Sequence, residues 1–96
     1  MNQAVNPPIP PEESLIQYPS AFPIKVMGVH VDTFVETVVA LVLEHDPTFD
    51  AASVVHRPSS GGKYLGLTIT VTATSREQLD NIYRALTSHP LVKYVL

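Results

Sequence analysis

One alternating segment constrains this chain more than any other feature. Across residues 65–73, every odd position holds leucine, isoleucine, valine or alanine, while the even positions hold one glycine and three threonines. Successive side chains of a β-strand point to opposite faces of its sheet. The segment is therefore predicted to be a strand with one buried face and one face that is not apolar.

Two apolar stripes with helical spacing lie on either side of this strand. Residues 31–42 and residues 79–86 repeat apolar side chains at i, i+3, i+4 and i+7, and a proline follows each stripe. Both segments are predicted to be helices that bury their stripe. Capping boxes predicted at the helix starts are Thr33-x-x-Glu36 for the first, and Thr74-x-x-Glu77 or Ser75-x-x-Gln78 for the second.

Three further segments, residues 22–30, 53–58 and 91–96, are predicted to be strands, so the order is βαββαβ. Each β-α-β crossover should be right-handed, which places both helices on one side of the sheet. The predicted fold class is a two-layer α+β sandwich, the ferredoxin-like arrangement with a four-stranded antiparallel sheet. Strands one and three should be central, and Pro58 confines strand two to an edge.

The predicted core lies between the helices and the sheet. The residues expected to be almost fully buried there are Val35, Val38, Val42, Ile69, Val71, Leu79 and Leu86. If Lys93 in the last strand points outward, alternation turns Leu91 and Val95 outward as well and leaves Val92 and Leu96 for the core.

The first quarter of the chain differs in composition from the rest. Five of the nine prolines precede residue 20, and proline removes donors that helices and sheets need. Residues 1–14 are predicted to form a flexible proline-rich arm, and residues 15–96 a single domain. The face of the sheet away from the helices is either free or covered within the same chain. Covering would come from Tyr18, Ala21 or other arm residues that fold back onto it.

Composition argues against several classes of function. The absence of cysteine removes disulfides, thiolate zinc sites and a cysteine nucleophile. A formal charge of −3 argues against nucleic-acid binding, and no apolar run approaches the roughly 18 residues of a membrane span. The four histidines lie on separate segments without metal-ligand spacing, so neither a metal nor another cofactor is expected. A cytoplasmic location is expected.

Three separated stretches, residues 22–28, 58–64 and 92–96, carry a resemblance to a known family. From about residue 15 to its end, the chain resembles the YbeD-like family of small uncharacterised bacterial proteins. The resemblance implies a ferredoxin-like fold similar to ACT regulatory domains, which bind small ligands such as amino acids, often at dimer interfaces. It implies no catalytic residue.

Catalytic motifs are missing from the residues themselves. No G-x-S-x-G occurs. Residues 60–63 resemble a phosphate-binding loop, but Tyr64 stands where that motif has serine or threonine, and the turn joins two strands. The loop at residues 28–34 lacks the arginine of acylphosphatases, and the third strand offers threonines where RNA-binding relatives carry aromatic rings. The chain is therefore predicted not to be an enzyme.

A ligand site is predicted in the loop after the first strand, at Gly28, His30 and Asp32. Gly28 lets backbone, helix or ligand approach closely, and the free amides at the start of the following helix can receive an anionic group. The alternative for Gly28 is a tight packing contact between helix and sheet.

An interface is predicted on the open sheet face. Met27, Val29, Leu91 and Val95 would form one apolar patch there, suited to a homodimer or a protein partner. The exposed edge of the last strand offers a second docking route.

The function predicted from the sequence is a non-catalytic regulatory or adaptor domain that binds a small metabolite or a protein partner. The alternative is a small enzyme acting on an acyl or phosphoryl substrate through the loop after strand one. An enzyme should present a charged or nucleophilic pair in that loop, where this chain has only His30 and Asp32.

Overall fold

The computed structural model describes residues 17–96, so the predicted arm at residues 1–14 lies outside the described residues. The elements are, in order, β1 (Ser20–Val29), α2 (Phe34–Leu43), a short 3-10 helix η1 (Ala51–Ser53), β2 (Val55–Pro58), β3 (Tyr64–Ala73), α3 (Arg76–Thr87) and β4 (Val92–Val95). This confirms the βαββαβ order and the ferredoxin-like α+β fold.

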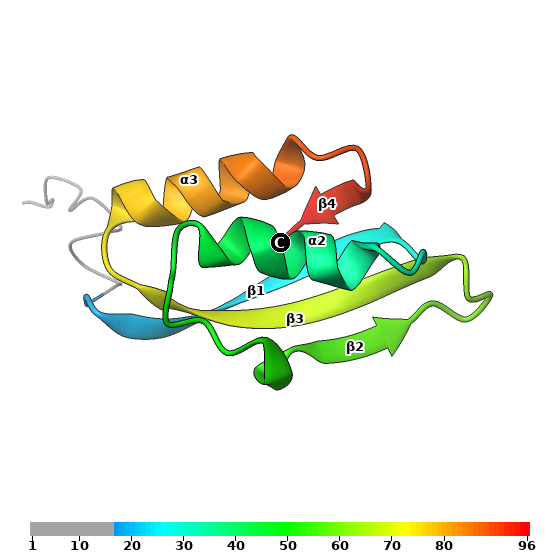
Figure 1. Cartoon of the computed structure of the whole chain (residues 1–96), viewed down its shortest axis with the longest axis horizontal. Helices are drawn as coiled ribbons and strands as arrows, with labels where there is room; N and C mark the ends of the chain where they lie inside the picture. Colours follow the sequence, from blue (N-terminus) through cyan, green and yellow to red (C-terminus); the bar gives the residue numbers. More distant parts are fainter. Residues whose placement is uncertain (1–16) are drawn as a thin grey trace, which may run out of the picture.

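The four strands form one antiparallel sheet in the order β2-β3-β1-β4. The two long strands are central and pair over their full length, from Ser20 opposite Ala73 to Val29 opposite Tyr64. Both helices lie on the same face of this sheet (Figure 1). Edge strand β2 ends at Pro58, which has no amide to donate to a further ladder bond.

The covered face of the sheet holds the core. Alternate residues of β1 and β3 point to the helices, and Ile24 stands directly opposite Ile69 with both side chains fully buried. Six of the predicted core residues are buried: Val38, Val42, Ile69, Val71, Leu79 and Leu86. Val35 is only partly buried, because α2 turns its preceding residue, Phe34, directly to the sheet.

The starts of the two helices differ from each other. Ser75 is extended (φ −168°), and its side chain accepts a hydrogen bond from the Gln78 amide, as the second capping box predicts. Thr33 instead has helical dihedrals, and its side chain makes no capping hydrogen bond. The box predicted at Thr33 was wrong, because a cap side chain reaches the first-turn amides from an extended residue.

Strand β4 departs from the predicted alternation. Val95 pairs with Val26 and Val92 pairs with Gly28, which leaves Lys93 as an extra residue at an irregularity in the ladder. Such a bulge lets two residues three positions apart share a face, so both valines point to the helices. Leu91 also packs against the core. The outward placement of Leu91 and Val95 was therefore wrong.

Leu96 was predicted to lie in the core, but 70% of its surface is exposed. Its backbone exchanges two hydrogen bonds with Lys25, which extends the ladder by one position beyond Val95. Because Val95 already faces the helices, the next side chain along the ladder emerges on the open face.

A buried carboxylate attaches the end of α2 to the sheet. Asp46 is 3% exposed and accepts hydrogen bonds from the amide and hydroxyl of Thr48 and from the Thr72 amide at 2.8 Å. The Gln78 side chain donates to the carbonyl oxygens of His45 and Thr72, each at 3.0 Å. These bonds join both helices to β3, which indicates a structural role for Asp46.

Candidate functional site

The predicted ligand loop begins at Gly28, which packs against a helix. A Cβ atom at this position would overlap the ring of Phe34 and the carbonyl oxygen of Leu91. The aromatic ring therefore occupies the space that a missing side chain leaves, as in the packing alternative. This contact leaves no room for a ligand beside Gly28 on the helix side.

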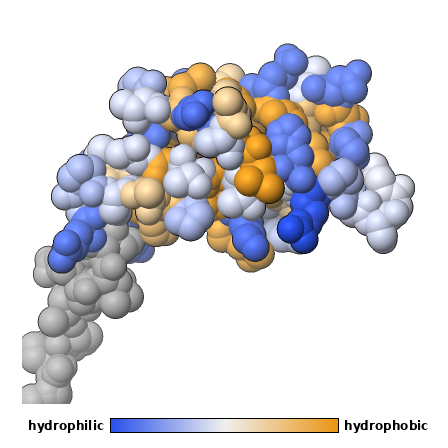
Figure 2. Space-filling model, turned by 90° about the horizontal axis from the view of Figure 1, so that it is seen from below, coloured by the Kyte–Doolittle hydropathy of each residue, from blue (hydrophilic) through white to orange (hydrophobic). Residues whose placement is uncertain are grey.

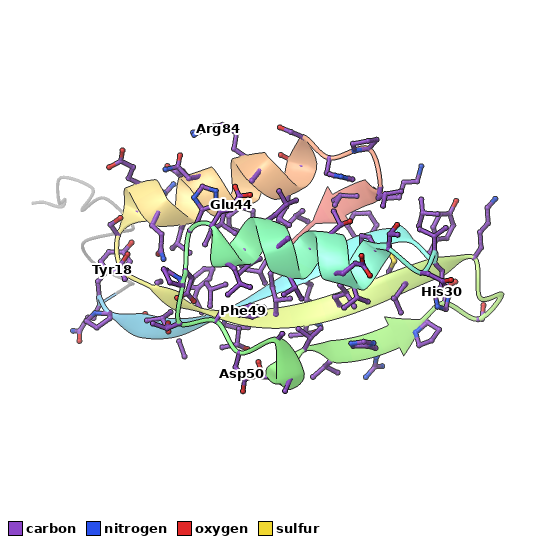
Figure 3. The ribbon with its side chains drawn as sticks, in the orientation of Figure 1. Tyr18, His30, Glu44, Phe49, Asp50 and Arg84 are labelled. Atoms are coloured by element: carbon purple, nitrogen blue, oxygen red, sulfur yellow. The ribbon has the colours of Figure 1, made fainter. Side chains whose placement is uncertain are left out.

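The other two residues of that prediction lie away from Gly28. His30 is exposed and turned to the β2–β3 hairpin, where its Nδ1 donates to the carbonyl oxygen of Gly62 at 3.0 Å (Figure 3). Asp32 is exposed in the turn before α2. A ligand role for Gly28, His30 and Asp32 stays a prediction.

The predicted apolar patch is changed by the β4 bulge. Met27 belongs to the open face and Val29 follows it two positions along β1. Leu91 and Val95 pack on the helix side, and Tyr94 takes their place as the direct partner of Met27. Self-association or docking of a protein through this face stays a prediction.

The open face instead carries a groove that spans all four strands. Two neighbouring rows of residues form its floor and walls. The first row, from β4 to β2, consists of Tyr94, Met27, Gly66 and Arg57. The second row consists of Leu96, Lys25, Thr68 and Val55. Together with Val26, Pro58, Ser59 and Leu67, these residues line a concavity of about 390 Å³, here called the sheet groove.

Gly66 gives the sheet groove its depth. The residues on either side of it on the same face of β3, Tyr64 and Thr68, both carry side chains. A Cβ atom at Gly66 would lie 3.4 Å from Met27 Cε and 3.4 Å from the Arg57 carbonyl oxygen, so a longer side chain would project into the groove. The sequence signal for this residue is a glycine inside a strand, which often marks close approach of a ligand.

Three of the four residues at the ends of the two rows are large, hydrophobic and exposed. Val55 is 55% exposed, Tyr94 is 50% exposed, and Leu96 closes the second row. Seen from the β2 side, hydrophobic residues reach the surface between hydrophilic ones (Figure 2). Large apolar side chains that gather around one concavity are typical of binding surfaces.

The groove also carries two basic side chains. Lys25 and Arg57 line it, and among residues 17–96 neither has an ion-pair partner. Strands β1 to β4 contain no aspartate or glutamate. Lys63 lies in the hairpin turn between β2 and β3, and Lys93 lies in β4. The fold thus brings together basic residues that are scattered in the sequence.

Neither Tyr18 nor Ala21 lines the groove. Tyr18 packs against the core at the end of the sheet opposite His30 (Figure 3), and Ala21 is exposed. On α3, burial raises the pKa of Tyr83, whose hydroxyl is 3.4 Å from the Leu96 carbonyl oxygen. This perturbed group lies outside the groove lining.

The groove lining consists of basic, hydroxyl and apolar groups. Its lining contains no carboxylate side chain and no imidazole. Across residues 17–96, no three histidine, aspartate or glutamate side chains are grouped to hold a metal ion. No helix in the same range is long and apolar enough to cross a membrane. The side chains of the groove can attract a ligand through charge and apolar contact.

Comparisons with known proteins agree with the sequence resemblance. The chain is 66% identical over 88 residues to a UPF0250 protein of Bordetella pertussis, covering 92% of this chain and 97% of that protein. It is 65% identical over 86 residues to a UPF0250 protein of Janthinobacterium sp. (strain Marseille), covering 90% and 94%.

The solution structure of HP0495 from H. pylori matches with a TM-score of 0.72 and 16% identity, covering 95% of this chain and 98% of that protein. This similarity supports the fold alone. The family model described as "Protein of unknown function (DUF493)" matches residues 13–96, so this chain belongs to the DUF493 family.

Proposed function

We propose that this protein is a non-catalytic binding module, of the regulatory or adaptor kind, that holds a small organic anion in the sheet groove. One observation carries the proposal. A concavity of about 390 Å³ lies over strands without aspartate or glutamate and is lined by Lys25 and Arg57. Its volume falls in the range of roughly 300–1,000 Å³ that is usual for small-molecule sites.

The two cations suit recognition of a carboxylate or phosphate. Arg57 offers a planar fork of donors that matches two acceptor oxygens, and Lys25 adds a flexible point charge. Thr68, which lies beside Lys25 in the second row, adds a hydroxyl donor. The charges are partly exposed, so the attraction weakens with added salt.

The apolar residues suit the rest of such a ligand. Met27 and Tyr94 stand next to each other in the first row, and Val55 lies at the far end of the second. An anion with an apolar portion would remove these side chains from water while its charge stays near Lys25 and Arg57.

The geometry gives less support to the enzyme alternative. Phe34 fills the space beside Gly28, and His30 Nδ1 is bonded to a backbone carbonyl oxygen in the hairpin turn. A reaction on an acyl or phosphoryl group in this loop would need a nucleophile or base close to the bound substrate. The sheet groove is better formed for binding than this loop is for catalysis.

A thermal-shift screen of anionic metabolites tests the proposal. A ligand at 100 times its dissociation constant should stabilise the wild-type chain by about 2.7 kcal/mol. Gly66→Thr fills the groove with a residue that favours strands, and it should reduce this stabilisation strongly. Thr70→Val, an open-face change outside the groove lining, should leave it unchanged.

Two results would contradict the proposal. In one, no anionic metabolite stabilises the wild-type chain. In the other, a stabilising metabolite protects Gly66→Thr as well as it protects the wild type, which would place its site elsewhere on the molecule.

A further inference from the structure

A second hollow adjoins the sheet groove on the open face. It is a shallow hollow of about 290 Å³, open to solvent and lined by Met27, Ser59, Tyr64, Lys93 and Tyr94. We call it the ring pocket. Three of these residues, Met27, Ser59 and Tyr94, also line the sheet groove. The two hollows are therefore adjacent parts of one surface, with Met27 between them.

The ring pocket brings two tyrosines from opposite sides of β1 toward the same methionine. Tyr94 on β4 is directly opposite Met27. On β3 the direct partner of Met27 is Gly66, and Tyr64 is two positions before it on the same face. Diagonal neighbours in a sheet lie about 7–8 Å apart, within reach of an aromatic side chain. Tyr64 and Tyr94 thus flank Met27.

These residues offer a planar ligand the contacts that it prefers. Aromatic rings attract one another in offset or edge-to-face arrangements, and a methionine sulfur contacts ring edges favourably. Tyr94 is half exposed. Among residues 17–96, no hydrogen bond occupies the hydroxyl group of Tyr64 or Tyr94. Both hydroxyl groups are therefore available to a ligand.

Cations surround the ring pocket as they do the groove. Lys93 lines it, and Lys63 Nζ lies 5.6 Å from the centroid of the Tyr64 ring, close enough for a cation–π contact. With Lys25 and Arg57 in the neighbouring groove, four basic residues surround Met27 and the two tyrosines. A neutral aromatic compound would use the rings and leave these charges without a partner.

Resting on the proposed function, we infer that the ring pocket is an aromatic subsite and that the ligand class is an aromatic anion. Its planar ring lies over Met27 between Tyr64 and Tyr94, and its carboxylate or phosphate extends to Lys25 and Arg57 in the sheet groove. The short distance between the two hollows requires a compact molecule in which ring and anionic group are separated by few bonds.

Four small probes separate the contributions of ring and charge. Phenyl phosphate and benzoate carry both, inorganic phosphate carries only the charge, and benzyl alcohol carries only the ring. In amide NMR titrations of the full chain, phenyl phosphate or benzoate should shift residues of both hollows. It should bind at least about 10-fold more tightly than inorganic phosphate or benzyl alcohol.

Variants then assign each contribution to its residues. Tyr94→Leu and Tyr64→Leu keep an apolar side chain and remove the ring, so phenyl phosphate affinity should fall by about 2- to 10-fold. The affinity for inorganic phosphate should not change. Arg57→Gln should weaken both phosphate probes, whereas Arg84→Gln on α3, with the same change of net charge, should weaken neither.

The outcomes distinguish this inference from the proposed function. If inorganic phosphate binds as tightly as phenyl phosphate, and neither tyrosine variant changes the affinity for phenyl phosphate, the aromatic subsite is wrong. The proposed anion site in the sheet groove then stands. If no anion shifts residues of either hollow, both proposals are wrong. Binding of single-stranded oligonucleotides that strengthens with length far beyond that of phenyl phosphate would also overturn the small-ligand class.

Discussion

The two faces of the sheet are built from the same strands and serve different purposes. On the helix side, Ile24, Ile69 and Val71 are removed from water almost completely. On the open side, Lys25 and Thr70, each adjacent in sequence to one of them, are exposed. Each large aliphatic side chain that is fully buried contributes about 1.5–3 kcal/mol, so the covered face carries most of the stability. The open face is consequently free to carry a binding site.

Two glycines show the same difference on a smaller scale. Gly28 faces the helices, where Phe34 fills the space above it, and Gly66 faces outward, where the space above it is the sheet groove. A missing side chain permits close packing in the first case and leaves open space in the second. The role of a strand glycine therefore depends on which face it occupies.

Shortening a buried side chain on the covered face should give the largest loss of stability. Leu86→Ala should reduce the free energy of unfolding by about 2–5 kcal/mol, because it leaves a cavity in the core. Val38→Ala should cost less, since it removes fewer buried atoms. Urea denaturation measures both losses. Leu96→Ala on the open side is the control and should change stability by less than about 0.5 kcal/mol. Equal losses for Leu86→Ala and Leu96→Ala would contradict this division of the sheet.

Adding one methyl group to each glycine should give the next largest effect. Gly28→Ala should destabilise by about 1–3 kcal/mol, because the new Cβ overlaps the Phe34 ring. Gly66→Ala should be neutral or stabilise by up to about 1 kcal/mol, because glycine is unfavourable inside a strand. Thermal unfolding of the two variants measures the difference. The comparison fails if both substitutions destabilise to the same extent.

The smallest expected change in stability is the difference between substitutions at two adjacent residues of β4. Val95→Lys should destabilise the fold by about 1 kcal/mol, because the long side chain must leave the helix side to keep its charge in water. Tyr94→Lys on the open side should cost less than about 0.5 kcal/mol. Chemical denaturation of the pair measures both values. The alternation predicted from the sequence gives the opposite result, with Val95→Lys tolerated, so this pair tests the bulge directly.

Much of the covered face follows from the residues alone. The alternation across β3 and the stripe of α3 predict their buried residues correctly, because each element keeps its ideal period. The first helix is less regular. Apolar residues lie on more than one side of this helix, so periodicity does not show whether Val35 or Phe34 is buried. The orientation of the helix on the sheet decides which of the two is buried.

The candidate site was less predictable than the core. A glycine among the threonines of β3 is visible in the sequence, and Gly66 could be identified from it. Tyr94 could not, because its outward direction depends on the irregular pairing of β4 with Met27 and Gly28. Tyr64 was missed because β3 begins one residue earlier than the apolar alternation.

The sequence by itself determined the order of the elements, the central position of β1 and β3, and the face of β3 that is buried. The element order and the buried face follow from local periodicity, which a chain carries whether or not it is folded. The central position of the two strands follows from the βαββαβ order. Only the tertiary structure decided which residues meet on the open face. Lys25, Arg57, Gly66 and Tyr94 come from four different strands, and their meeting depends on the register between those strands. Register is set by long-range pairing, and one extra residue at Lys93 reverses the direction of every side chain that follows it.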